Sequence, residues 1–339
     1  MDTRRFPTEI LVLIFSYTIS NRYVGLYPHE SPVLLTRVCR HWRNVALSTP
    51  LLWSALEIRD LPPLELCDSF SYSLATWLSL SDPVPLSFRF RAYRKHEAVL
   101  PHYLNCLFEH ASRWKEVFLD VPNYDFFSTA PAPQFCALES LTVRGFQADD
   151  PVNHTLRYRL GGHPGPKPGI PSGMFIVSWM AGCSQSLRTL ILDTSTVNIS
   201  DADLAYALSG LRNLRSLTLA GYKYSEVLLN ALTLTFSPSG QLETGQNAML
   251  EDMALYIYFS AEVPSLFVAL ANMVKSRWHI PQNAMDRAAT ARLKTFGLDG
   301  RTWGGMAAVA PRETSVMNKC RAEGLHLKDN GVWQLLLQV

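Results

Sequence analysis

An unbroken apolar run near the N-terminus predicts a helix without a polar face. Residues 10–15 read ILVLIF, and at about 100° per residue six consecutive apolar side chains surround a helix completely. Pro7 suits a first helical turn, where its missing N–H would have no partner, and Glu9 favours the positive end of the helix dipole. A helix with this pattern must be covered on all sides.

A second helix, predicted over residues 32–48, is amphipathic. Its apolar residues recur at spacings of three and four: Leu34, Leu35, Val38, Trp42 and Val45. We interpret the arginines on its other face as solvated rather than as a nucleic-acid site, because the chain has a net charge of only +2. About fifty residues in short helices cannot cover both apolar surfaces, so the pattern predicts a partner protein.

Beyond residue 59, short strings of the form L-x-x-L-x-L alternate with helical stretches. Clear copies begin at residues 138, 187, 214, 250 and 293, and related strings begin at 114 and 324. One intervening helix, after the predicted N-cap Ser200, is expected to end at Gly210. We predict an irregular leucine-rich-repeat-like α/β solenoid over residues 59–339. An α/β sandwich with alternating elements is the alternative.

The same strings predict which side chains face outward. Their leucines point into the core, and alternation turns the residues between and after them to the other face. On this basis we predict a substrate-binding face made from Arg144, Asp193, Thr218, Tyr256, Asp299, His326 and Lys328. Its mixed charges and aromatic ring suit a protein or peptide better than a polyanion. The alternative is an ordinary solvated sheet surface.

Glycine and proline predict an exposed, mobile loop at residues 161–173, which read GGHPGPKPGIPSG. Residues 21–31, between the two N-terminal helices, are expected to form a second mobile loop.

Composition predicts a soluble chain with a large core, since 47% of the residues are hydrophobic and 18% are charged. The six cysteines are scattered without a CxxC pair, which indicates reduced thiols and a cytoplasmic or nuclear protein. The run from Ile10 to Phe15 is too short for a signal peptide or a bilayer span. We expect no membrane association.

Candidate chemistry is sparse. His102, Cys106 and His110 recur at helical spacing, but a fourth ligand is not evident, so we expect core or surface residues and no metal. Neither GxSxG nor HExxH occurs, and we predict no catalytic residue and no cofactor. A hydrolase whose Cys/His or Ser/His pair is assembled by the fold is an alternative.

The N-terminal residues resemble the F-box family. FPTEILVLIFSY, followed by LLTRVCRHWRNVALSTPLLW, matches that family's apolar, Val-Cys-x-x-Trp and Leu-Trp positions. The matching residues are Pro7, Glu9, Ile10, Leu11, Ile14, Phe15, Val38, Cys39, Arg40, Trp42, Leu52 and Trp53. The tail ALSTPLLWSAL is similar to F-box proteins of fungal type. Phe6 replaces the usual leucine, and residues 21–31 lengthen the link between the helices.

The resemblance implies that residues 1–58 dock on the Skp adaptor of a cullin–RING ubiquitin ligase. We therefore expect a non-catalytic substrate receptor whose repeat domain, residues 59–339, binds a target protein. Its adaptor-binding residues are predicted to be Pro7, Ile10, Leu11, Ile14, Phe15, Leu35, Val38, Cys39 and Trp42. The alternative for Trp42 is the module's own core. The alternative for the chain is a scaffold outside the ubiquitin system, with the N-terminal helices as a cap.

Overall fold

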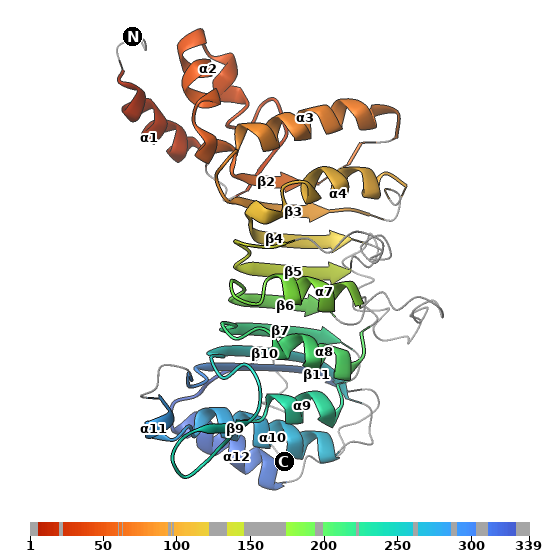
Figure 1. The fold of residues 1–339 in the computed structure, drawn as a ribbon, viewed down its shortest axis with the longest axis vertical. Helices are drawn as coiled ribbons and strands as arrows, with labels where there is room; N and C mark the ends of the chain where they lie inside the picture. Colours follow the sequence, from red (N-terminus) through yellow and green to blue (C-terminus); the bar gives the residue numbers. More distant parts are fainter. Residues whose placement is uncertain are drawn as a thin grey trace. The chain divides into compact units, whose positions relative to one another are not determined.

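The computed structural model is a mixed α/β protein with an N-terminal helical module and parallel strands (Figure 1). It separates into two compact units, Met1–Phe126 with Pro133–Ala148, and Phe127–Ala132 with Asp149–Val339. The structure describes residues 6–19, 23–59, 61–62, 64–93, 96, 98–121, 134–145, 174–193, 199–221, 224–259, 264–285, 290–302 and 311–329. The predicted loop at 161–173 lies outside them.

The first unit begins with short helices. They are α1 (Thr8–Thr18), η2 (Leu34–Arg37), α2 (Arg40–Leu47) and η3 (Pro50–Trp53). The single helix predicted over residues 32–48 is wrong, because Cys39 is extended, with φ −157° and ψ 169°. Its Sγ accepts a hydrogen bond from the backbone N–H of Trp42 at 3.5 Å, and this starts a new helix.

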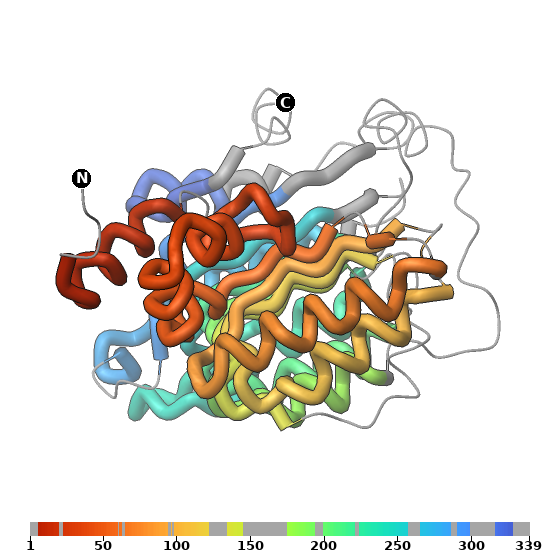
Figure 2. Tube along the Cα trace, turned by 90° about the horizontal axis from the view of Figure 1, so that it is seen from above, coloured from red at the N-terminus to blue at the C-terminus, as the bar shows by residue number. Residues whose placement is uncertain are grey.

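Parallel strands follow in the order β1-β2-β3-β4-β5. Their bounds are Val24–Gly25, Ala55–Ile58, Leu86–Arg91, Trp114–Val121 and Ser140–Gly145. Helices α3 (Cys67–Leu80) and α4 (Leu100–Phe108) run along one face of these strands (Figure 2). Short 3₁₀ turns, η4 (Leu64–Leu66) and η6 (Ala111–Arg113), adjoin them.

One feature of this unit, strand β1, differs from expectation. The stretch 21–31 was predicted as a loop, yet β1 lies within it and pairs with β2. The predicted domain boundary after residue 58 falls where β2 ends, and β2 pairs along its whole length with β3. The helical module therefore continues into the sheet through backbone hydrogen bonds.

The second unit repeats strand and helix. Its parallel strands are β6 (Thr189–Asp193), β7 (Ser216–Gly221), β10 (Asp252–Phe259), β11 (Thr295–Thr302) and β12 (His326–Asp329). Its helices are α7 (Met174–Gly182), α8 (Asp201–Ser209), α9 (Glu226–Leu232), α10 (Pro264–Trp278), α11 (Gln282–Met285) and α12 (Pro311–Ala322). A small antiparallel pair, β8 (Thr235–Phe236) with β9 (Leu242–Thr244), follows α9.

Every predicted L-x-x-L-x-L string contains a strand, and the strands align in register. Leu190, Leu217, Met253, Phe296 and Leu327 form one row across neighbouring strands. The first four of these are at most 2% exposed, so the leucine positions form the core as alternation predicts. The mixed α/β prediction is confirmed, and the solenoid stays a prediction.

The predicted signals at the two ends of α8 are confirmed as well. Ser200 Oγ accepts a hydrogen bond from the backbone N–H of Asp203 at 3.1 Å and so caps α8, which ends at the C-cap Gly210. All six cysteines are free thiols, and Cys67, Cys183 and Cys320 are buried. Among the described residues, no helix is both long and apolar enough to cross a bilayer.

Candidate functional site

Helix α1 has a buried side and an exposed apolar side. Leu11 and Phe15 are fully buried, and the Phe15 ring packs on Trp42 with their centroids 4.9 Å apart. The exposed side carries residues at positions i, i+3, i+4 and i+7 of one helical face. They are Ile10, Leu13, Ile14 and Tyr17, exposed by 44, 54, 39 and 80%. These four residues form the apolar face of α1.

A second exposed apolar pair follows in η2 and at its C-cap. Leu34 and Val38 are 44 and 53% exposed, whereas Leu35 between them is buried. Cys39 and Trp42 are half-buried, and Pro7 is exposed.

The predicted adaptor-binding set is thus divided by the fold. Pro7, Ile10, Ile14 and Val38 are accessible, while Leu11, Phe15 and Leu35 fill the module's own core. Sequence reasoning left out Leu13, Tyr17 and Leu34, since a helix that is apolar all round does not indicate which side is covered. The i+3 and i+4 spacing of Leu13 and Tyr17 from Ile10 and Ile14 was the available signal.

The predicted substrate-binding residues of the second unit share one face of its strands. Asp193, Tyr256 and Asp299 lie in one register row, through Ala220. Thr218 and Lys328 belong to the next row, and His326 to the row after it. Tyr256 and His326 are exposed, and Asp193 and Thr218 are half-buried. The side chains of Asp299 and Lys328 lie outside the described part.

Arg144, the remaining predicted residue, belongs to the first unit. It lies near two further arginines that the sequence reasoning missed. Its guanidinium carbon lies 5.7 Å from the centroid of the Phe118 ring. Those of Arg91 and Arg89 lie 5.3 and 6.0 Å from the same centroid. The three arginines and Phe118 together form the arginine face. The signal was the alternation in LSFRFR, residues 86–91, which lacks the leucine string.

Aromatic and acidic side chains complete this face. Arg89 also lies over the ring of Tyr23, 4.4 Å from its centroid. The Tyr23 hydroxyl donates a hydrogen bond to Glu116 at 3.2 Å, and Glu57 pairs with Arg59 at 3.9 Å. Among the described residues, no carboxylate forms an ion pair with Arg89 or Arg91.

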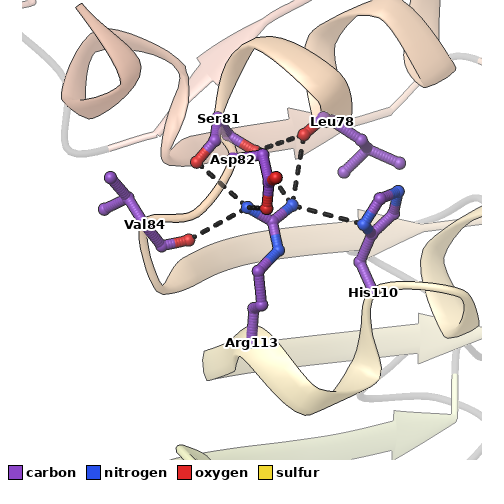
Figure 3. Close-up of polar contacts among 6 residues, drawn as sticks. All are labelled: Leu78, Ser81, Asp82, Val84, His110 and Arg113. Carbon is purple, nitrogen blue, oxygen red and sulfur yellow. Dashed lines mark hydrogen bonds and ion pairs between the residues drawn. The ribbon is translucent and has the colours of Figure 1, made fainter.

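The histidines and cysteine weighed as metal ligands do not converge. His110 follows the end of α4, and its Nδ1 lies 3.3 Å from Arg113 Nη2 (Figure 3). His102 instead lies near Cys67 and Asp68, with one potential ligand atom of each within 4.8 Å of the others. This proximity could not be predicted from spacing, because Cys67 and Asp68 belong to a different helix, α3. Burial raises the pKa of the Cys106 thiol and so disfavours its thiolate.

The helical module coincides with a match to a known family. Residues 4–59 match the family model of F-box-like domains. This range contains α1, β1, η2, α2, η3 and β2. No curated protein matches the chain.

Proposed function

Because the chain carries an F-box-like domain at residues 4–59, we propose that it is a substrate receptor of an SCF-type cullin–RING ubiquitin ligase. F-box domains typically bind the Skp adaptor, and through it this chain would reach a cullin. The receptor would itself make and break no bonds. It would act by holding a target protein close to the ubiquitin-loading partner.

The apolar face of α1 is the observation that carries the proposal. Ile10, Leu13, Ile14 and Tyr17 are all exposed on one side of an eleven-residue helix. A contiguous apolar face on a folded chain typically marks an interaction site, because its burial is favourable by about 25 cal/mol per Å². Pro7 and Val38, both exposed, extend the proposed surface.

The second part of the proposal is an irregular leucine-rich-repeat-like solenoid that binds the target. Its support is the aligned register of Leu190, Leu217, Met253 and Phe296, with successive helices packed on one another. In such an array the outward positions of the strands form an extended surface. Asp193, Tyr256 and His326 lie at outward positions of this kind.

Adaptor binding by an Ile14→Asp variant tests the first part. A charge in the buried centre of an interface should weaken binding by at least about tenfold, or about 1.4 kcal/mol. The measurement is titration of the purified full chain with purified Skp adaptor. Val227→Asp is the matched control, since Val227 is also exposed, by 56%, but lies on α9.

Unchanged affinity of Ile14→Asp, or an equal loss in Val227→Asp, would contradict the proposed surface. Leu11→Asp does not serve this test, because Leu11 is fully buried and its replacement would unfold the module.

A scaffold with a helical cap is the second candidate. The observation that favours it is the pairing of β2 with β3, which continues the F-box-like domain into the sheet. This candidate predicts that the unaltered chain does not bind the adaptor at all.

A further inference from the structure

We propose that the arginine face, made from Arg89, Arg91, Arg144 and Phe118, binds an acidic segment of a target protein. The inference rests on the proposed receptor function, since it assigns the class of substrate that such a receptor would hold. It places recognition on the first unit, beside the adaptor-binding module in the sequence.

The strands bring these residues to one face. Arg89 is in register with Phe118, and Arg91 with Asp120, which in turn is in register with Arg144. The alternate positions Phe88, Phe90, Val117 and Leu119 are at most 2% exposed and belong to the core. The arginines therefore lie on the face opposite the core, because successive side chains of a strand point to opposite faces.

Neither Arg89 nor Arg91 forms an ion pair with a carboxylate within the described residues. Glu57 is paired with Arg59, and Glu116 accepts a hydrogen bond from Tyr23. Arg89 and Arg91 are half-buried and contact aromatic rings in place of carboxylates. The Nε of Arg91 is buried without an acceptor. Partly desolvated guanidinium groups without acceptors gain most from an anionic partner, which they bind through paired N–H donors.

The segment 21–31, which lengthens the link between the two N-terminal helices, positions one side chain of the arginine face. Residues Val24 and Gly25 pair with β2, and this places the Tyr23 ring under Arg89. Stacking on a fixed ring limits the rotamers of Arg89 before any ligand binds. A ligand then pays less conformational entropy for its contacts.

A protein segment fits better than a nucleic acid. Glu57, Glu116 and Asp120 lie on the same face as the arginines, and they would repel a continuous phosphate backbone. The net charge of +2 supplies no wider basic surface. A peptide can place carboxylate or phosphate oxygens over the arginines and neutral groups over the acids.

The test uses the full chain, without adaptor, and fluorescence anisotropy of two labelled peptides at about 50 mM salt. One peptide holds about six glutamates, and the other holds phosphoserine in their place. Arg89→Gln with Arg91→Gln should weaken binding at least about tenfold. Arg212→Gln with Arg321→Gln, at two exposed arginines of the second unit, removes the same charge and should change the affinity less than about twofold.

Three results would overturn the proposal: equal weakening in both double variants, no binding of either peptide, or equally tight binding of a single-stranded oligonucleotide of similar charge. The stronger of the two peptides identifies the anion as carboxylate or phosphate. If the Arg89/Arg91 variant does not fold, Arg144→Gln decides, since Arg144 is exposed; unchanged affinity there would overturn the proposal. Adaptor titration of the same proteins separates this failure from a failure of the receptor function.

Discussion

Two pairs of arginines in the described part of the chain differ in what surrounds the guanidinium group. Arg277 and Arg113 donate hydrogen bonds to backbone carbonyls. Arg89 and Arg91 lie on aromatic rings. A guanidinium that donates several hydrogen bonds to carbonyls holds the chain together, whereas one that donates none remains available to a ligand.

Arg277 is the most enclosed of them, with no exposed surface. It donates to the carbonyl oxygens of Leu232, Asn247 and Gln246 at 2.8, 2.9 and 2.5 Å. These bonds join α10 to the end of α9 and to the segment that precedes β10. Burial lowers the pKa of Arg277 to about 9, so it still carries its charge at neutral pH.

Arg113 closes the C-terminal end of α3 (Figure 3). It donates to the carbonyl oxygens of Leu78, Ser81 and Val84 at 3.1, 3.0 and 3.2 Å. Asp82 lies 3.2 Å away as its counter-ion, but that carboxylate is mostly exposed. The cation meets the negative end of the helix dipole, where such charges are stabilising.

The largest effect is expected from Arg277→Met. The variant removes three hydrogen bonds to backbone carbonyls, of which, among the described residues, only the Asn247 oxygen keeps another donor, the N–H of Leu250. The free energy of unfolding should fall by about 3–5 kcal/mol. Urea unfolding followed by circular dichroism measures the loss. Lys275→Met is the control, because Lys275 is exposed on the same helix; an equal loss there would contradict the role of Arg277.

Arg113→Met is expected to cost less, about 2–3 kcal/mol, since part of its side chain reaches solvent. Arg113→Lys should recover only a fraction, because an ammonium group cannot span the three carbonyls as a planar fork does. Exposed Arg40→Met in the same unit is the control. Full recovery by lysine would show that charge, rather than geometry, holds the end of α3.

A smaller, pH-dependent effect is expected at His110. Burial, and then the charge of Arg113, lower its pKa, while Glu109 and Asp82 act in the opposite direction. A lowered pKa in the folded state means that the stabilisation is complete above the unfolded value of about 6.5 and is lost as the pH falls. Unfolding between about pH 7.5 and 5 should be less pH-dependent in His110→Gln, by under about 1 kcal/mol after solvent screening. Identical pH profiles would contradict the contact.

Much of the strand framework follows from the sequence, because leucines at fixed spacing give both the strand and its buried side. Leu190, Leu217 and Phe296 illustrate this in the second unit. The break at Cys39 could not be predicted, since the apolar spacing runs through it and a thiol is an uncommon cap. Strand β1 is two residues long, too short for any periodicity.

The sites were less predictable than the strands. Alternation alone indicates that Arg89, Arg91 and Arg144 point away from the core, but Arg144 comes from another strand. Only the register of β3, β4 and β5 brings them to one ring. Likewise, ILVLIF gives an apolar helix but does not distinguish the buried Leu11 from the exposed Ile14.

The smallest change in stability is expected from Arg89→Met with Arg91→Met, and it is the sharpest test of the comparison. Neither side chain forms an ion pair within the described residues, and the Nε of Arg91 is buried without an acceptor. Replacing partly desolvated charge with an apolar chain of similar length is often neutral or stabilising. The free energy of unfolding should therefore change by less than about 1 kcal/mol in either direction. Because lost cation–π contacts with Tyr23 and Phe118 would lower stability, each by about 0.5–1 kcal/mol at exposed sites, the two contributions oppose each other.

Urea unfolding beside Arg277→Met measures the contrast. A loss of stability as large as that of Arg277→Met would mean that Arg89 and Arg91 stabilise the fold, which would contradict their role as ligand-binding groups.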